Sequence, residues 1–242
     1  MKNLRFLFFI ILLCFSPHNV SAHQETVLQV RTIAISPYGI DSHGELSGIY
    51  YDLANHLLSK AGLESEHLIF PYSRIIHELK IGKTDLTIMF KYKELVDYVD
   101  YIYPLPSLKN VVIGRKGTDF SSVKQLEKRS IAYLRGAKFS DDVDNNPEII
   151  KQKVSDFRQG LLMLKKGRVD AIIGPMAPII SAAKLLGLNK GFFGRPLIVS
   201  ERTPWLQISK KSHDKISAKQ LEVIFRQMMI HGELKEIQQK YQ

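Results

Sequence analysis

Short apolar runs alternate with amphipathic segments along most of the chain. The run Val27 to Ile35 is rich in β-branched residues and ends at Ser-Pro-Tyr-Gly, which predicts a strand followed by a turn. Apolar side chains then recur at helical spacing up to Gly62, which predicts a helix. Strand, helix and strand follow again over residues 67–90. This alternation predicts an α/β fold with a parallel sheet covered on both faces.

One pattern of ten residues occurs twice, as LKIGKTDLTI over residues 79–88 and as LKKGRVDAII over residues 164–173. Each copy predicts the end of a helix, a glycine that allows positive φ, and a buried strand. We expect each copy to belong to its own α/β lobe, and a chance likeness between two ordinary helix-to-strand turns is the alternative. Asp85 and Asp170 are interpreted as turn residues rather than as a catalytic pair.

The second half of the chain restarts the same scheme. Residues 129–134 read as a strand, residues 136–143 as a turn opening a helix, and residues 156–167 as a helix before another strand. Two segments, near 103–117 and 195–209, are expected to cross between the two sheets and leave a cleft that closes by hinge motion. The predicted organisation is a signal peptide at 1–22, lobe one at 23–110 and 197–242, and lobe two at 111–196.

The N-terminal segment has the features of an export signal. Lys2 and Arg5 precede the apolar run Phe6 to Phe15, and small or β-branched residues follow up to Ala22. About 20 apolar residues are needed to cross a bilayer, and this run is shorter. We expect export to the periplasm with cleavage after Ala22, and an N-terminal membrane anchor is the alternative.

Composition excludes several kinds of site. The chain of 242 residues has 45% hydrophobic and 24% charged residues, which is typical of a soluble globular protein. Its only cysteine, Cys14, lies in the predicted signal, so the mature chain has no disulfide and no thiolate. The net charge of +10 favours anionic partners, but predicted export and scattered lysines argue against nucleic acid. We found no G-x-S-x-G or HExxH motif, and we expect no cofactor.

Several phrases together resemble the type II periplasmic solute-binding proteins of extracellular solute-binding family 3, the amino-acid-binding group. The phrases, in the family's order, are SPYG with GELSGIYYDLANHLLSKAG, LKIGKTDLTI, VVIGRKG, LKKGRVDAII and GELKEIQQKY. The resemblance implies a periplasmic-binding-protein-like II (Venus-flytrap) fold. It also implies capture of a small polar solute, amino-acid-like or anionic, for an inner-membrane ABC-type permease or a sensor.

We expect the protein to be a monomer and not an enzyme. The alternative that the resemblance leaves open is an enzyme on the same fold, such as a cyclohexadienyl-dehydratase-like lyase, because some relatives are dehydratases acting on cyclic carboxylates.

The chain departs from the amino-acid-binding members at three places. The stretch MFKYKELVDY lacks the arginine that in those members holds the ligand's α-carboxylate in a bidentate way. Pro175 stands where those members have an aspartate for the ammonium group, and Ala137 and Lys138 replace a usual threonine. The resemblance therefore implies the fold without fixing the ligand.

Arg74 is the candidate to replace the missing arginine, because it lies in the first turn of the helix after the second strand. A surface pair with Glu78, one turn on, is the alternative. Aromatic residues just beyond strand ends either wall the pocket or pack in the core. At the lobe-two turn, the amides of residues 137–139 are expected to point into the cleft. The candidate ligand-binding residues are Tyr38, Tyr72, Arg74, Phe90, Tyr92, Arg135, Lys138 and Phe139.

Overall fold

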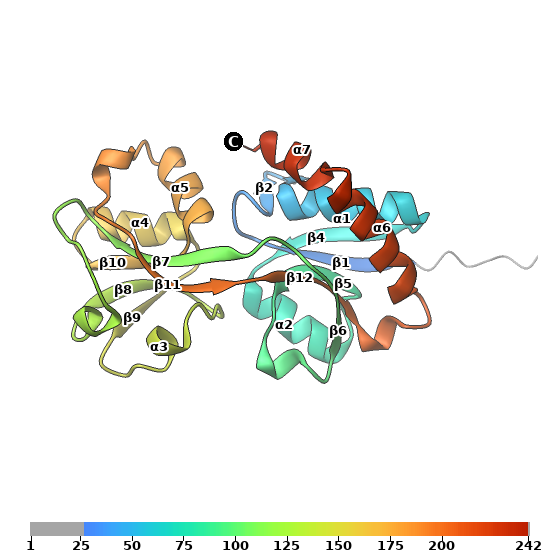
Figure 1. Cartoon of the computed structure of the whole chain (residues 1–242), viewed down its shortest axis with the longest axis horizontal. Helices are drawn as coiled ribbons and strands as arrows, with labels where there is room; N and C mark the ends of the chain where they lie inside the picture. The colour runs from blue at the N-terminus through green and yellow to red at the C-terminus, as the bar shows by residue number, and fades with distance from the viewer. Residues whose placement is uncertain (1–26, 242) are drawn as a thin grey trace, which may run out of the picture.

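A computed structural model describes residues 27–241, and the predicted signal peptide and its cleavage site lie outside them. Two five-stranded sheets lie end to end, and helices pack against each (Figure 1). The predicted α/β fold is therefore confirmed. The helices are α1 (Ile49–Ala61), α2 (Tyr72–Ile81), α3 (Asp141–Asp144), α4 (Phe157–Lys165), α5 (Met176–Leu185), α6 (Ala218–Ile230) and α7 (Glu233–Gln239).

The two sheets have the same arrangement. The first has the order β4-β1-β5-β12-β6 and the second, read from its other edge, the order β9-β8-β10-β7-β11. In each sheet, three parallel strands are followed by one strand that is antiparallel to them and then by an edge strand that is antiparallel to that one. The strands of the first sheet are β1 (Leu28–Ile33), β4 (Ser65–Phe70), β5 (Leu86–Phe90), β6 (Val99–Pro104) and β12 (Pro204–Ser209). Those of the second are β7 (Leu108–Gly114), β8 (Ser130–Leu134), β9 (Ile150–Val154), β10 (Ala171–Pro175) and β11 (Leu197–Arg202).

Lobe one is defined as the first sheet with α1, α2, α6 and α7. Lobe two is defined as the second sheet with α3, α4 and α5. A hairpin of β2 (Ile40–Ser42) and β3 (Glu45–Ser47) precedes α1. Within residues 27–241, the helices are all too short or too polar to span a membrane.

The chain passes between the sheets twice, at residues 105–107 and at Thr203. The two crossings lie side by side, since the Leu105 amide donates to the Pro204 carbonyl at 2.9 Å and the hydroxyls of Ser107 and Thr203 are 2.7 Å apart. These positions differ by a few residues from the lobe boundaries expected at 110/111 and 196/197, because β7 and β11 both pair within the second sheet. The division into a signal peptide and two domains stays a prediction.

The repeated ten-residue pattern has the same place in both lobes. Gly82 and Gly167 have φ of 76° and 68° and end the helices before β5 and β10. Those two strands lie in different sheets, and every residue in them is buried, as expected for strands covered on both faces. The positive φ explains why glycine occupies both positions.

The repeated aspartates fasten each buried strand to its neighbour. Asp85 accepts a hydrogen bond from the Gln29 amide at 2.7 Å, near the start of β1, and Asp170 accepts one from the Ser130 amide at 2.8 Å, at the start of β8. In both lobes the aspartate's own amide donates back to the carbonyl of that same residue at 2.7 Å. The interpretation of Asp85 and Asp170 as turn residues agrees with these bonds, which also fix where parallel pairing begins.

Replacement of the two aspartates should have unequal effects. Asp85 is 2% exposed and also accepts from Ser212 and Lys215, so Asp85→Ala should lower the free energy of unfolding by about 3 kcal/mol. Asp170 is 37% exposed at its side chain, so water can replace its bond and Asp170→Ala should cost about 1 kcal/mol. Urea denaturation measures both losses, and equal losses would contradict this account.

Candidate functional site

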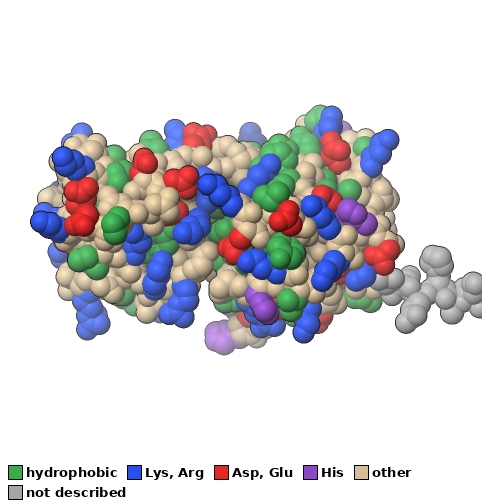
Figure 2. Space-filling model, turned by 90° about the horizontal axis from the view of Figure 1, so that it is seen from below, with side chains coloured by type: hydrophobic (Ala, Val, Ile, Leu, Met, Phe, Trp, Pro, Cys, Tyr) green, Lys and Arg blue, Asp and Glu red, His purple; other side chains and the backbone are tan. Residues whose placement is uncertain are grey.

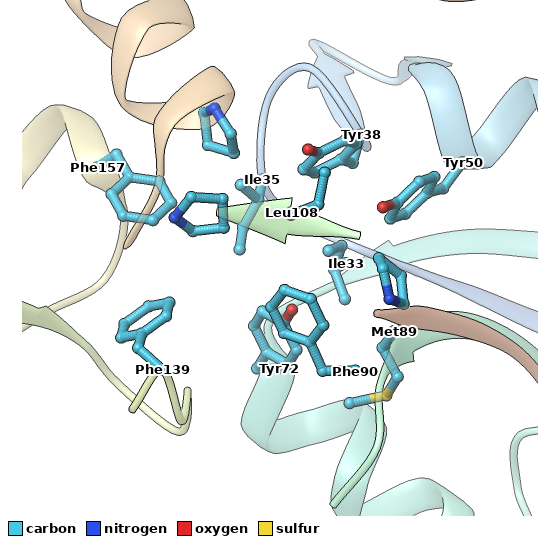
Figure 3. Close-up of a pocket in the computed structure, with 13 residues that line it drawn as sticks. Ile33, Ile35, Tyr38, Tyr50, Tyr72, Met89, Phe90, Leu108, Phe139 and Phe157 are labelled. Atoms are coloured by element: carbon cyan, nitrogen blue, oxygen red, sulfur yellow. The ribbon is translucent and has the colours of Figure 1, made fainter. Parts of the chain in front are cut away.

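A cavity lies where the carboxyl ends of the parallel strands of the two lobes face each other (Figure 3). Ile33 and Phe90 end strands of lobe one, and Pro175 ends a strand of lobe two. Leu108 and Pro204 come from the strands next to the two crossings. The lining residues are Ile33, Ile35, Tyr38, Tyr50, Tyr72, Met89, Phe90, Leu108, Phe139, Phe157, Pro175, Pro178 and Pro204.

None of these thirteen described residues is charged. The side-chain hydroxyls among them belong to Tyr38, Tyr50 and Tyr72, and the rings of Tyr38 and Tyr50 are stacked with centroids 4.3 Å apart. Burial raises the pKa of all three tyrosines, so each hydroxyl stays protonated and can both donate and accept a hydrogen bond. As the lobes stand, the cavity has room for no more than about one water molecule.

A wider open groove follows the lobe boundary beside the cavity and shares Phe139 with it. Basic side chains lie on both lobes across the face seen in Figure 2, with acidic ones among them. The groove is lined by charged side chains from both lobes, whereas the described residues that line the cavity include none. Its lining residues are Lys91, Tyr92, Lys93, Glu94, Val96, Tyr101, Lys138, Phe139, Ser140, Asp141, Asp144, Asn145, Ser200 and Arg202.

Arg202, the last residue of β11, connects the two lobes. Its guanidinium donates to the Lys91 carbonyl of lobe one at 2.5 Å and to the Lys138 carbonyl of lobe two. The same group lies 4.9 Å from the ring centroid of Phe90 and 5.6 Å from that of Tyr92. Arg202 was not among the residues predicted from the sequence, although it lies in the segment expected to cross between the lobes.

Two further contacts join the lobes. The hydroxyls of Ser36 and Ser181 are 2.8 Å apart, and a Cβ atom placed on Gly136 would lie 3.2 Å from Ser73. Together with Arg202, these contacts describe a closed arrangement of the lobes.

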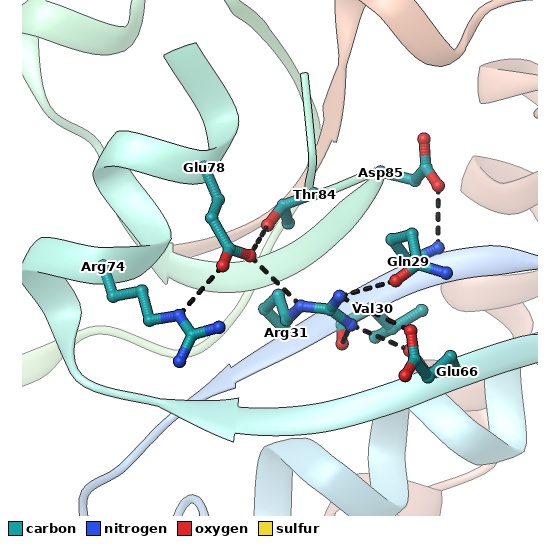
Figure 4. Close-up of polar contacts among 8 residues, drawn as sticks. All are labelled: Gln29, Val30, Arg31, Glu66, Arg74, Glu78, Thr84 and Asp85. Carbon is teal, nitrogen blue, oxygen red and sulfur yellow. Dashed lines mark hydrogen bonds and ion pairs between the residues drawn. The ribbon is translucent and has the colours of Figure 1, made fainter. Parts of the chain in front are cut away.

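Arg74 lies away from the cavity. Its Nε donates to Glu78 at 2.9 Å, its guanidinium lies 3.4 Å from the ring centroid of Phe70, and its side chain is 56% exposed (Figure 4). Burial opposes the ionisation of Glu78, but hydrogen bonds from Arg74, Thr84 and Arg31 outweigh it and lower the pKa of that carboxyl. The structure therefore shows the pair with Glu78, and Arg74 lines neither the cavity nor the groove.

The lobe-two turn also differs from expectation. The Ala137 amide donates to the Leu134 carbonyl, and the Phe139 amide donates to the carboxylate of Asp144 at 3.0 Å. These amides are therefore used within the turn rather than offered to a ligand. Arg135 is exposed and outside both hollows.

The remaining candidates gather at the lobe boundary, and their contact with a ligand stays a prediction. Tyr38, Tyr72, Phe90 and Phe139 line the cavity, and Tyr92, Lys138 and Phe139 line the groove.

The sequence matches the family model of bacterial extracellular solute-binding proteins, family 3, over residues 30–242. The chain belongs to this family. Membership gives it a solute-binding role with a small-molecule ligand. A comparison with curated proteins gives no significant match.

Solved structures share the fold at low sequence identity. An ancestral arginine-binding protein bound to arginine is 24% identical, with a TM-score of 0.75, and the match covers 89% of this chain and 97% of that one. The GluR0 ligand-binding core from Nostoc punctiforme in complex with L-glutamate is 19% identical, with a TM-score of 0.75 and coverages of 88% and 98%. The BvgS VFT2 domain of Bordetella pertussis is 16% identical, with a TM-score of 0.69 and coverages of 89% and 93%.

The two arginines should respond differently to mutation. Arg202→Gln removes two charge-assisted bonds across the lobe boundary and should weaken closure by about 1 to 3 kcal/mol, which populates a more open state. Arg74→Ala breaks a pair within lobe one and should leave closure unchanged. Small-angle X-ray scattering should show a larger radius of gyration for Arg202→Gln only. An increase for Arg74→Ala, or none for either variant, would contradict these assignments.

Proposed function

We propose that this family member is a reversible, non-catalytic binding protein of the periplasm that delivers its solute to an inner-membrane ABC-type importer or a sensor. The observation that carries the proposal is the cavity wall, which both lobes and both crossing segments build together. A ligand held there contacts both lobes at once, so its binding favours closure. The similar structures bound to arginine and to glutamate support a small-molecule solute as the ligand.

The cavity lining favours binding over a dehydratase-like lyase. A general acid or base works best with a pKa near the working pH. The titratable groups that line the cavity are tyrosines whose pKa burial raises, so they stay protonated at neutral pH, cannot accept a proton as bases, and are weak acids. Their protonated hydroxyls suit hydrogen bonding to a ligand.

Binding should stabilise the protein without consuming the solute. A ligand at about a hundred times its Kd adds roughly 2.7 kcal/mol, which should raise Tm by about 5 to 10 °C for a chain of this size. Leu108→Trp fills the cavity and should abolish the shift, while Ile198→Trp, at an exposed position on β11, should retain it. Mass spectrometry should recover the ligand unchanged. Steady consumption of a stabilising compound would instead establish the lyase.

Export is tested separately. The predicted signal should be removed after Ala22, so intact-mass analysis of a periplasmic extract should give a chain that begins at His23. A full-length product held in the membrane fraction would refute cleavage and favour the N-terminal anchor.

A further inference from the structure

We propose that the solute is an uncharged, largely apolar small molecule that carries a ring and a hydrogen-bonding group such as a hydroxyl. This inference rests on the proposed function and names the class of solute that the cavity takes. It departs from the amino-acid-like or anionic solute that the family resemblance implies.

The cavity offers no partner for a charge. Removal of an ammonium or carboxylate group from water costs several kcal/mol unless an opposite charge and hydrogen bonds replace its hydration. An amino acid would bring both charges into a space lined by thirteen uncharged residues. Arg74 is not available, because it pairs with Glu78 outside the cavity.

Arg202 uses two of its five N–H donors within the protein. Both of its terminal nitrogens donate to carbonyls, one in each lobe, and these bonds close the groove side of the cavity. A carboxylate that took over Arg202 would leave the Lys91 and Lys138 carbonyls without those bonds.

What the cavity does offer is aromatic surface with a few hydroxyls. Rings approach from both lobes, with Tyr72 and Phe90 on one side and Phe139 and Phe157 on the other (Figure 3). Aromatic side chains bind ring-shaped ligands through stacked and edge-to-face contacts. The hydroxyls of the lining tyrosines can satisfy one polar group on the solute. Because the closed cavity holds no more than about one water molecule, the lobes must separate to admit the solute.

Four compounds with the same phenol ring separate the effect of charge from that of shape. They are p-cresol, which is uncharged, 4-hydroxyphenylacetate, which is an anion, tyramine, which is a cation, and tyrosine, which is a zwitterion. Isothermal titration calorimetry of the mature protein at pH 7 should show saturable binding of p-cresol. Its Kd should be about 100-fold or more below that of tyrosine, because the zwitterion leaves buried charges without partners.

Pro178 is a position at which the cavity can be given a charge. It is buried, lines the cavity, and is the third residue of α5, where a carboxylate is favourable for the helix. Pro178→Asp should weaken p-cresol and make tyramine the best ligand of the four. Pro178→Asn has the same shape without the charge and should keep the wild-type order.

Each outcome decides the inference. A wild-type preference for tyrosine, tyramine or 4-hydroxyphenylacetate would overturn the uncharged class while leaving the proposed function standing. Binding of p-cresol that Pro178→Asp does not weaken would place it outside the cavity and also overturn the inference. If none of the four compounds binds, the inference fails, and native mass spectrometry of protein taken directly from cells decides the proposed function by whether a small molecule is retained.

Discussion

The two crossings of the chain between the sheets are the constraint on which the rest of the structure depends. They lie side by side and are joined to each other through Leu105 with Pro204 and through Ser107 with Thr203. Two adjacent connections allow rotation of the lobes about one line but little sliding. The carboxyl ends of the parallel strands in both sheets consequently face one another, and the residues just beyond those ends form the cavity. Its composition is therefore determined by strand ends, by turns and by the first residues of helices in both lobes.

This geometry explains why part of the site could be predicted from the sequence. A residue that directly follows a buried parallel strand lies at the cleft in any two-lobed arrangement of this kind. Tyr38, Tyr72 and Phe90 are close to the ends of strands with strong apolar patterns, and all three line the cavity. The roles of the repeated glycine and aspartate could also be predicted from the sequence, because a helix end and the start of a buried strand are local features. Local patterns therefore located the walls of the cavity.

Other features depend on contacts between distant segments, which local patterns do not encode. Arg202 reaches the carbonyl of Lys91, 111 residues earlier in the chain, and nothing in its neighbours marks it. The helix position of Arg74 is compatible with either the cleft or the surface, and the ion pair with Glu78 holds its side chain at the surface. The strand β9, IKQKV, lacks apolar alternation because it lies at the edge of its sheet. No helix was predicted after β10, where α5 follows with Pro178 in its first turn, a place where proline is tolerated.

The fold is able to bury a charge where it provides partners. Arg31 in β1 is 6% exposed, and its guanidinium donates to Glu78 at 3.2 Å, to the Val30 and Glu66 carbonyls at 2.9 and 3.0 Å, and to Gln29 at 2.5 Å (Figure 4). That full set of acceptors offsets the loss of hydration. The cavity is at the carboxyl end of the same strand, yet its wall contains no comparable set of acceptors or donors. A buried charge is therefore tolerated where hydrogen-bonding and ionic partners surround it, whatever the depth of burial. Because the cavity wall lacks such partners, it favours an uncharged solute over a charged one. Selectivity within the uncharged class then depends on where the tyrosine hydroxyls lie relative to the rings.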